Sequence, residues 1–162
     1  MNGRDSSSKA IVAVVEDRPG VLYRVSSSIR RRGINIDSMN VSPIGNSGFS
    51  KMVFIVRAEE ETAEHLVKSI AKTPSVLSVE LLELGESVVR ELALLKVAVH
   101  GKRREVVEVL RRCDAKVLID EGETLIAEVV GAPEELNAVV ELLDSLAVLL
   151  DVSRSGPLAL RR

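Results

Sequence analysis

Apolar segments with strand-like and helix-like spacing follow one another in the same order twice along this chain. In each half the order is strand, helix, strand, strand, helix, strand. The strands are short apolar or alternating runs, and the helices repeat apolar residues three and four positions apart. The repeat is one of pattern and not of sequence identity. It predicts an α+β fold of two ferredoxin-like βαββαβ domains, each a four-stranded sheet with two helices on one face.

The predicted boundaries follow from the same spacing. In the first half, strands are expected at residues 9–15, 34–43, 50–57 and 75–84, with helices at 21–32 and 59–73. In the second half, strands are expected at 91–100, 115–120, 124–130 and 147–152, with helices at 102–112 and from Pro133 to Leu146. Residues 85–90 are predicted to form a polar connection and 153–162 a tail. The domains are therefore placed at 9–84 and 89–162, and each first strand is expected beside its third.

Charge and hydropathy exclude several classes of partner. The chain has 162 residues with 22 basic and 24 acidic side chains, for a formal net charge of −2. That balance argues against nucleic-acid binding and against a polybasic membrane contact. No apolar stretch reaches membrane-spanning length, and residues 1–8 lack the apolar region of a signal peptide. A cytoplasmic protein without membrane attachment is expected.

The usual catalytic and metal-binding patterns are missing from the sequence. Aromatic residues make up 2%, too few for an RNA-binding sheet. Cys113 is the only cysteine, and His65 and His100 have no neighbouring partner, so no metal site is predicted. No Ser/His/Asp set, phosphate loop or paired catalytic carboxylates can be identified. We expect no catalytic residues, and therefore no enzyme acting alone.

The stretch from Glu16 to Leu22 links the first strand to the first helix. Gly20 has no Cβ, so a ligand can approach its backbone closely. The N–H groups of Gly20, Val21 and Leu22 lie at the positive end of the helix dipole and can receive a carboxylate. Asp17 adds a negative charge beside them, and Pro19 suits the first positions of the helix. This combination fits a zwitterion such as a free amino acid. The alternative is a plain turn in which Asp17 caps the helix.

Four segments then carry a family resemblance. Residues 15–25 (VEDRPGVLYRV) and 31–39 (RRGINIDSM) resemble the ACT domain of the small regulatory subunit of acetolactate (acetohydroxyacid) synthase. Residues 89–97 (VRELALLKV) resemble the start of that family's C-terminal domain, and 152–160 (VSRSGPLAL) its terminal motif. The resemblance extends from about residue 10 to 161. Some members of the family have Asn where this chain has Asp17.

The resemblance implies a partner and a role. In that family a separate large subunit carries thiamine diphosphate, magnesium and FAD, and condenses two pyruvates or pyruvate with 2-ketobutyrate. The small subunit holds no cofactor. It raises the activity of the large subunit and confers feedback inhibition by a branched-chain amino acid, usually valine and otherwise leucine or isoleucine. It is a homodimer through its ACT domains, with effector sites at their interface.

Carried onto this chain, the resemblance implies an effector site, with no catalytic or metal-binding residue. Its residues are Asp17, Pro19, Gly20, Val21, Leu22, Asn35 and Ile36. The Asn35 amide can donate and accept, so it can bridge to the effector across a dimer interface. Ile34, Ile36 and Leu22 are candidates for an aliphatic wall. The alternative for Asn35 is a local hydrogen bond at the start of its strand.

Two other functions stay open from the residues alone. One is a free-standing ACT-domain amino-acid sensor that controls another enzyme or a transcription factor. The other is a small enzyme of the same fold, such as an acylphosphatase-type hydrolase. That enzyme needs a phosphate-cradling loop with an arginine in the first turn. Arg18 is present, but the glycine pattern is absent.

Overall fold

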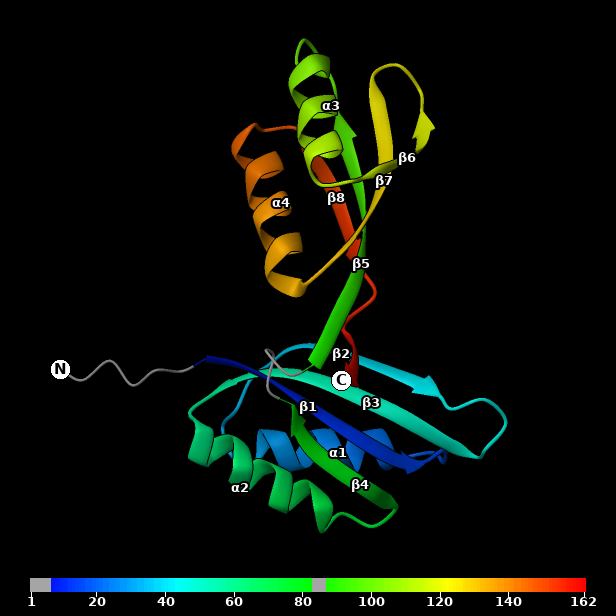
Figure 1. Ribbon diagram of the computed structural model, residues 1–162, viewed down its shortest axis with the longest axis vertical. Coiled ribbons are helices and arrows are strands. Elements are labelled where there is room, and N and C mark those ends of the chain that lie inside the picture. Colours follow the sequence, from blue (N-terminus) through cyan, green and yellow to red (C-terminus); the bar gives the residue numbers. More distant parts are fainter. Residues whose placement is uncertain (1–6, 83–86) are drawn as a thin grey trace, which may run out of the picture. The chain divides into compact units, whose positions relative to one another are not determined.

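The chain divides into two compact units, each with its own sheet and its own pair of helices (Figure 1). The structure is a computed structural model, and it describes residues 7–82 and 87–162. Unit 1 comprises Met1–Val88 together with Pro157–Arg162, and unit 2 comprises Val89–Gly156. Residues 83–84 of the predicted fourth strand and residues 85–86 of the predicted connection lie outside the described residues. No helix in the described part is long and apolar enough to cross a membrane.

Unit 1 has the predicted βαββαβ order. Its elements are β1 (Ser7–Glu16), α1 (Val21–Arg30), β2 (Ile36–Pro43), β3 (Phe49–Ala58), α2 (Glu60–Ala71) and β4 (Val76–Leu82). The sheet order is β2-β3-β1-β4, and every neighbouring pair is antiparallel. Both helices cover the same face (Figure 1). The predicted α+β class, and the prediction that the first strand lies beside the third, are confirmed.

The core of unit 1 lies between that sheet face and the helices. Alternate residues of β1 point into it, and α1 and α2 contribute residues spaced three and four apart. The largest fully buried side chains there are Ile11, Ile29, Phe54, Leu66 and Ile70. Removing one of these to alanine costs about 2–5 kcal/mol in typical cores, so this packing fixes α1 on the sheet.

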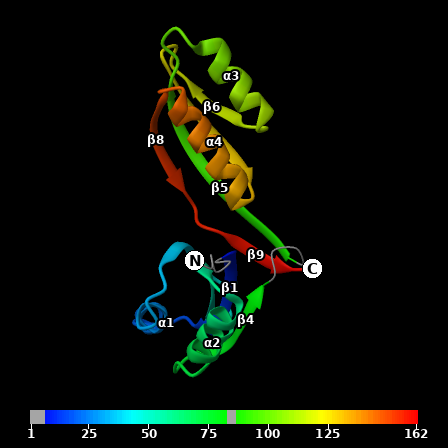
Figure 2. The same ribbon diagram turned by 90° about the vertical axis from the view of Figure 1, so that its left-hand side faces the viewer.

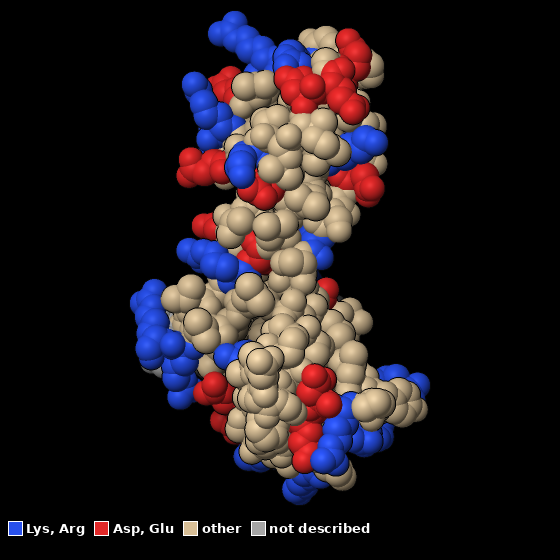
Figure 3. All heavy atoms as spheres, turned by 90° about the vertical axis from the view of Figure 1, so that its right-hand side faces the viewer, with Lys and Arg blue, Asp and Glu red and all other residues tan. Residues whose placement is uncertain are grey.

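Unit 2 repeats the arrangement. Its elements are β5 (Ser87–Ala98), α3 (Arg103–Arg112), β6 (Lys116–Asp120), β7 (Thr124–Gly131), α4 (Pro133–Ser145) and β8 (Leu149–Arg154). The order is β6-β7-β5-β8. Its core includes Leu95, Leu110, Leu125, Leu136 and Leu143. Acidic and basic side chains are interspersed on the face of this unit seen in Figure 3.

Two segments differ from the prediction. Residues 87–90, predicted as a connection, begin β5 because their burial alternates, with Ser87 and Val89 buried. Residues 153–162, predicted as a tail, extend β8 to Arg154 and then form β9 (Leu158–Arg161), which pairs with β5. In both views β9 lies on the side of the unit 1 sheet away from α1 and α2 (Figures 1 and 2). Arg161 of β9 pairs with Glu80 of β4, with Nη2 3.3 Å from Oε2.

The start of α1 also differs. Gly20, with φ +84°, is the N-cap, and the helix begins at Val21. Pro19 therefore lies before the helix and not in its first turn. A left-handed φ is readily adopted only by glycine, so Gly20 fixes the angle between β1 and α1. At the other end, α1 stops at Arg30, and Gly33 (φ +68°) turns the chain toward β2.

Candidate functional site

The predicted carboxylate-binding site is an exposed turn between β1 and α1. Asp17 donates its N–H to the carbonyl oxygen of Gly48 at 2.9 Å, which ties the turn to the β2–β3 loop. Val21 N–H donates to the Arg18 carbonyl oxygen at 3.3 Å. Of the three predicted N–H donors, the one of Val21 therefore already has a partner within the turn. Within the described residues, no intrachain hydrogen bond involves the N–H of Gly20 or Leu22. Asp17 is not the N-cap of α1, because Gly20 occupies that position.

Arg24 lies beside this turn and was not predicted as a site residue. A Cβ built on Gly20 would lie 3.5 Å from Nη1 of Arg24. Long side chains on a helix point back toward its N-terminus, which brings a residue four positions on over the cap. The spacing of four between Gly20 and Arg24 was the sequence signal that could have identified Arg24. A guanidinium here adds positive charge beside the two amides that remain available.

Asn35 and Ile36 lie at the opposite end of the same sheet. Ile36 of β2 is opposite Val56 of β3, which is opposite Lys9 of β1, whereas the turn follows Glu16. Positions 9 and 16 of β1 are seven residues apart, or about 23 Å along the strand. One chain therefore does not bring Asn35 and Ile36 together with Asp17 and Gly20.

The side chains of this second group differ in burial. Asn35 is exposed, and its Nδ2 donates to Oδ1 of Asp37 at 3.5 Å. Ile36 is half-buried and packs against the unit 1 core together with Ile34. A surface depression of about 340 Å³ brings Asn35, Ile34 and Ile36 together with Tyr23 and Arg30 of α1. The Asp17–Leu22 turn does not line it.

Strand β2 forms one edge of the unit 1 sheet and carries exposed apolar side chains. Met39 lies opposite Phe54 and Val41 opposite Met52, so both point to the helix-covered face. Each is 37% exposed. An edge strand also presents unpaired N–H and C=O groups. This edge can accept a further strand.

Unit 2 contains a buried ion pair that joins the two ends of its chain segment. Glu91 on β5 is 1% exposed. Arg154 on β8 donates from Nε to Oε1 at 3.0 Å and from Nη2 to Oε2 at 2.6 Å. Gly156 N–H also donates to Oε1 at 3.1 Å, and Arg154 Nη1 donates to the Asn137 side chain at 2.6 Å. Both carboxylate oxygens thus accept hydrogen bonds, which is what a buried charge requires.

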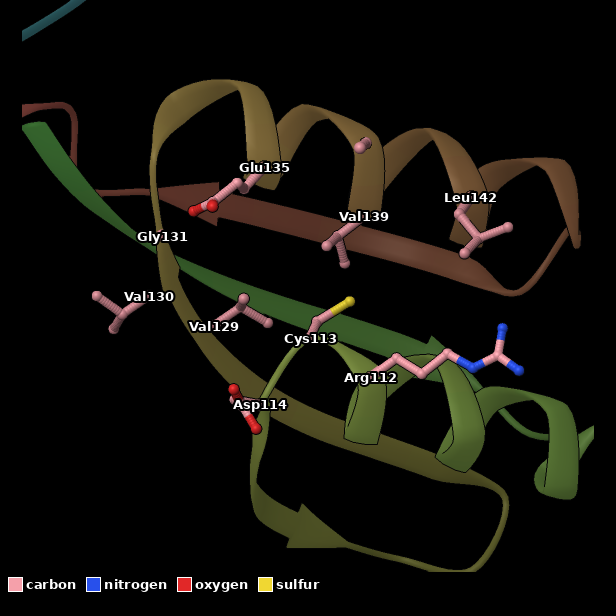
Figure 4. A pocket seen from close by; sticks show the side chains of 10 residues that line it. Arg112, Cys113, Asp114, Val129, Val130, Gly131, Glu135, Val139 and Leu142 are labelled. Carbon is pink, nitrogen blue, oxygen red and sulfur yellow. The ribbon is translucent and has the colours of Figure 1, made fainter. Parts of the chain in front are cut away.

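A mostly apolar pocket of about 450 Å³ lies between the end of α3, β7 and α4 (Figure 4). Its apolar wall includes Val129, Val139 and Leu142, and Cys113 also lines it. Burial raises the pKa of the Cys113 thiol, with a smaller contribution from the Asp114 charge. The thiol is therefore mostly neutral and a weak nucleophile at neutral pH. Glu135 in the wall accepts a hydrogen bond from the Ala132 N–H at 2.6 Å at the start of α4.

In the described part of the chain, no cluster of three or more His, Cys, Asp or Glu side chains could hold a metal ion.

Comparison with known families matches both halves of the chain. Residues 11–78 match the model described as an AHAS small subunit-like ACT domain, so unit 1 contains an ACT domain. Residues 90–162 match the model described as the small subunit of acetolactate synthase. The chain belongs to the family of acetolactate synthase small subunits.

Individual acetolactate synthase small subunits are similar to this chain over most of its length. The acetolactate synthase small subunit of Mycolicibacterium smegmatis is 35% identical over 150 residues, covering 92% of this chain and 88% of that protein. A probable acetolactate synthase small subunit of Methanothermobacter thermautotrophicus is 32% identical, covering 94% and 91%. The crystal structure of the Thermotoga maritima small subunit matches with a TM-score of 0.85 and 27% identity, over 96% of this chain and 98% of that one.

Proposed function

We propose that this protein is the regulatory subunit of an acetolactate synthase, and that it activates a separate catalytic subunit and makes it sensitive to valine. Family membership supports the role, and the Gly20 turn with Arg24 is the observation that carries the effector site. In this proposal thiamine diphosphate, magnesium and FAD belong to the catalytic subunit, and this chain binds none of them.

The effector site is completed by a second copy of the chain. If two β2 edges pair antiparallel, the start of one β2 lies beside the end of the other. The end of β2 is opposite Ser50, which is opposite Val15, next to the Gly20 turn. The second copy's Asn35 and Ile36 are thereby brought to the end of the sheet where the first copy's Asp17 and Gly20 lie. The exposed Met39 and Val41 side chains become buried in the same contact.

Each group in this site has a partner on a bound amino acid. The N–H groups of Gly20 and Leu22 and the Arg24 guanidinium receive the carboxylate, because charge-assisted hydrogen bonds are strong there. Asp17 faces the ammonium group, and the Asn35 amide of the second copy reaches the same ligand. Leu22 and the second copy's Ile36 contact the aliphatic side chain.

Inhibition requires that valine bind one arrangement of the regulatory dimer more tightly than another. Coupling free energies between sites are typically about 1–3 kcal/mol, or roughly 5- to 150-fold in affinity. A site shared by two copies supplies such a difference, because its geometry changes whenever the two copies move relative to each other.

The test is to mix the purified chain with its catalytic subunit at several ratios and to measure acetolactate formation with and without valine. We expect no synthase activity from this chain alone, a higher rate in the mixture, and inhibition by valine that the catalytic subunit alone does not show. Leucine and isoleucine are run in parallel. An unchanged rate at every ratio would favour a free-standing ACT-domain sensor.

The dimer contact gives a second test. Replacing Val41 by lysine puts a charge into the proposed β2–β2 contact, a device that natural edge strands use against pairing. We expect Val41→Lys to sediment as a monomer and to lose valine inhibition. Leu77→Lys is the matched control, since Leu77 is 52% exposed on β4, the other edge of the sheet. A dimeric Val41→Lys, or the same result for both variants, contradicts the proposed interface.

A further inference from the structure

A second pocket of unit 1 is strongly positive. It has a volume of about 470 Å³ and lies between α1 and the end of α2. Four cationic side chains line it, namely Arg24, Arg30, Arg31 and Lys72. Its lining includes no Asp or Glu, and the sequence has none between residues 18 and 36 or between 65 and 79. In a chain of net charge −2, this is a local concentration of positive charge.

The floor of the pocket is built from buried hydroxyl groups. Ser28 is 2% exposed and Thr73 is 9% exposed, and their hydroxyl oxygens lie 3.4 Å apart. Arg31 donates from Nη2 to the Ser28 hydroxyl at 3.1 Å, and that hydroxyl donates to the Arg24 carbonyl oxygen at 3.1 Å. These bonds hold Arg31 in place over the floor before any ligand binds.

One donor at this pocket has no protein partner. The Nε of Arg24 is buried and makes no hydrogen bond within the described structure. An unpaired buried donor is destabilising because it has lost its hydrogen bonds to water. An anion in the pocket could accept this hydrogen bond and remove that destabilisation.

Helix dipoles do not account for the whole cluster. Cations at helix C-termini are favourable, which explains Arg30 and Arg31 at the end of α1 and Lys72 at the end of α2. Arg24 lies one turn into α1, near its positive N-terminus, where a cation is not favoured by the dipole. The four charges together exceed what the two helix ends require.

We propose that this pocket binds the phosphate group of a small phosphorylated molecule, at a site that shares only Arg24 with the proposed amino-acid site. Planar guanidinium groups bind phosphate oxygens in pairs, and the Ser27 and Ser69 hydroxyls at the wall can donate to the remaining oxygens. A dianion matches four cations better than a single carboxylate does. The site does not depend on the proposed valine function. Because Arg24 lines this pocket and also lies beside Gly20, occupancy here should alter the nearby turn.

The experiment uses the full chain with pyrophosphate, inorganic phosphate and an acidic peptide as probes, at constant ionic strength set with chloride. Binding is measured by calorimetry and mapped by NMR shifts of the backbone amides. The test variant is Arg31→Gln/Lys72→Gln. Its matched control is Arg32→Gln/Lys68→Gln, which removes the same charge from neighbouring exposed positions that do not line the pocket.

We expect pyrophosphate to shift the amides of Ser28, Ser69 and Thr73. We expect the test variant to bind about tenfold or more weakly, and the control to bind within about twofold of the wild type because surface charges are screened by salt. Three results overturn the proposal: no binding at millimolar pyrophosphate, equal losses in both variants, or binding of an acidic peptide but not of phosphate. The last would identify a protein-docking surface instead. The wild-type shift map stands even if a variant fails to fold.

Discussion

Replacing Arg154 by methionine is expected to lower the free energy of unfolding of unit 2 by about 3 kcal/mol. The change leaves the Glu91 carboxylate buried without its guanidinium partner, and breaking a buried pair in this way typically costs about 3–5 kcal/mol. The Arg154 side chain is 30% exposed, so water can replace part of the interaction, and the lower end of that range applies. Hydrogen exchange at the β5 amides of Leu95 and Val97 measures the loss within unit 2 itself.

A double-mutant cycle separates this pair from general effects of losing an arginine. Arg111→Met removes an exposed arginine from α3 and should change the stability of unit 2 by less than about 0.5 kcal/mol. Glu91→Gln combined with Arg154→Met removes the stranded charge but keeps an acceptor for Gly156 N–H. That double variant should recover most of the loss, because the two residues are coupled. A single-variant effect below about 1 kcal/mol means that the pair does not hold β5 to β8.

The ion pair also shows why part of the fold could not be predicted. Glu91 and Arg154 are 63 positions apart, and each belongs to a segment that resembles the family. Nothing in the spacing says that these segments meet. They meet because β5 and β8 are antiparallel neighbours, with Ala93 opposite Arg154. Sequence periodicity predicts that the strands exist, whereas the partner of each polar side chain depends on the register.

Helices were predicted well where an apolar stripe decides the structure. Leu66 and Ile70 of α2, and Leu136 and Leu143 of α4, have the spacing of a core-facing helix stripe, and all four are buried. Residues 87–90 were assigned to a connection because they look polar. Their alternation continues that of β5, and burying Val89 outweighs the polarity of its neighbours. Short segments at unit boundaries are decided by such packing and not by local composition.

The candidate site was predictable at the turn but not as a whole. Gly20 was identified for close backbone approach, and its left-handed φ agrees with the need for glycine there. Arg24 was missed, although its spacing of four from Gly20 was visible. The use of Val21 N–H within the turn depends on a hydrogen bond to Arg18 that no sequence pattern specifies. Whether Asn35 and Gly20 belong to one site depends on a second copy of the chain.

Gly20→Asp is expected to weaken valine inhibition at least tenfold while leaving activation of the catalytic subunit in place. The new side chain would start 3.5 Å from Nη1 of Arg24, so its carboxylate can take the place of the effector carboxylate. It brings the same charge to the same amides and guanidinium as the ligand does. A tenfold loss corresponds to about 1.4 kcal/mol.

The matched control for that variant is Gly20→Asn, which has nearly the same shape but no charge. Asn and Asp both tolerate a left-handed φ better than other side chains do, so any backbone strain is shared by the two variants and cancels in the comparison. Synthase activity is measured against valine concentration for both variants and the wild type, with the same catalytic subunit. We expect Gly20→Asn to retain more valine sensitivity than Gly20→Asp. Only the Asp carboxylate carries the charge needed to compete with the valine carboxylate for the same amides and guanidinium. Equal inhibition curves for the two variants would contradict the proposal that the effector carboxylate binds at Gly20. Loss of both activation and inhibition in both variants would mean that the left-handed turn matters for folding alone.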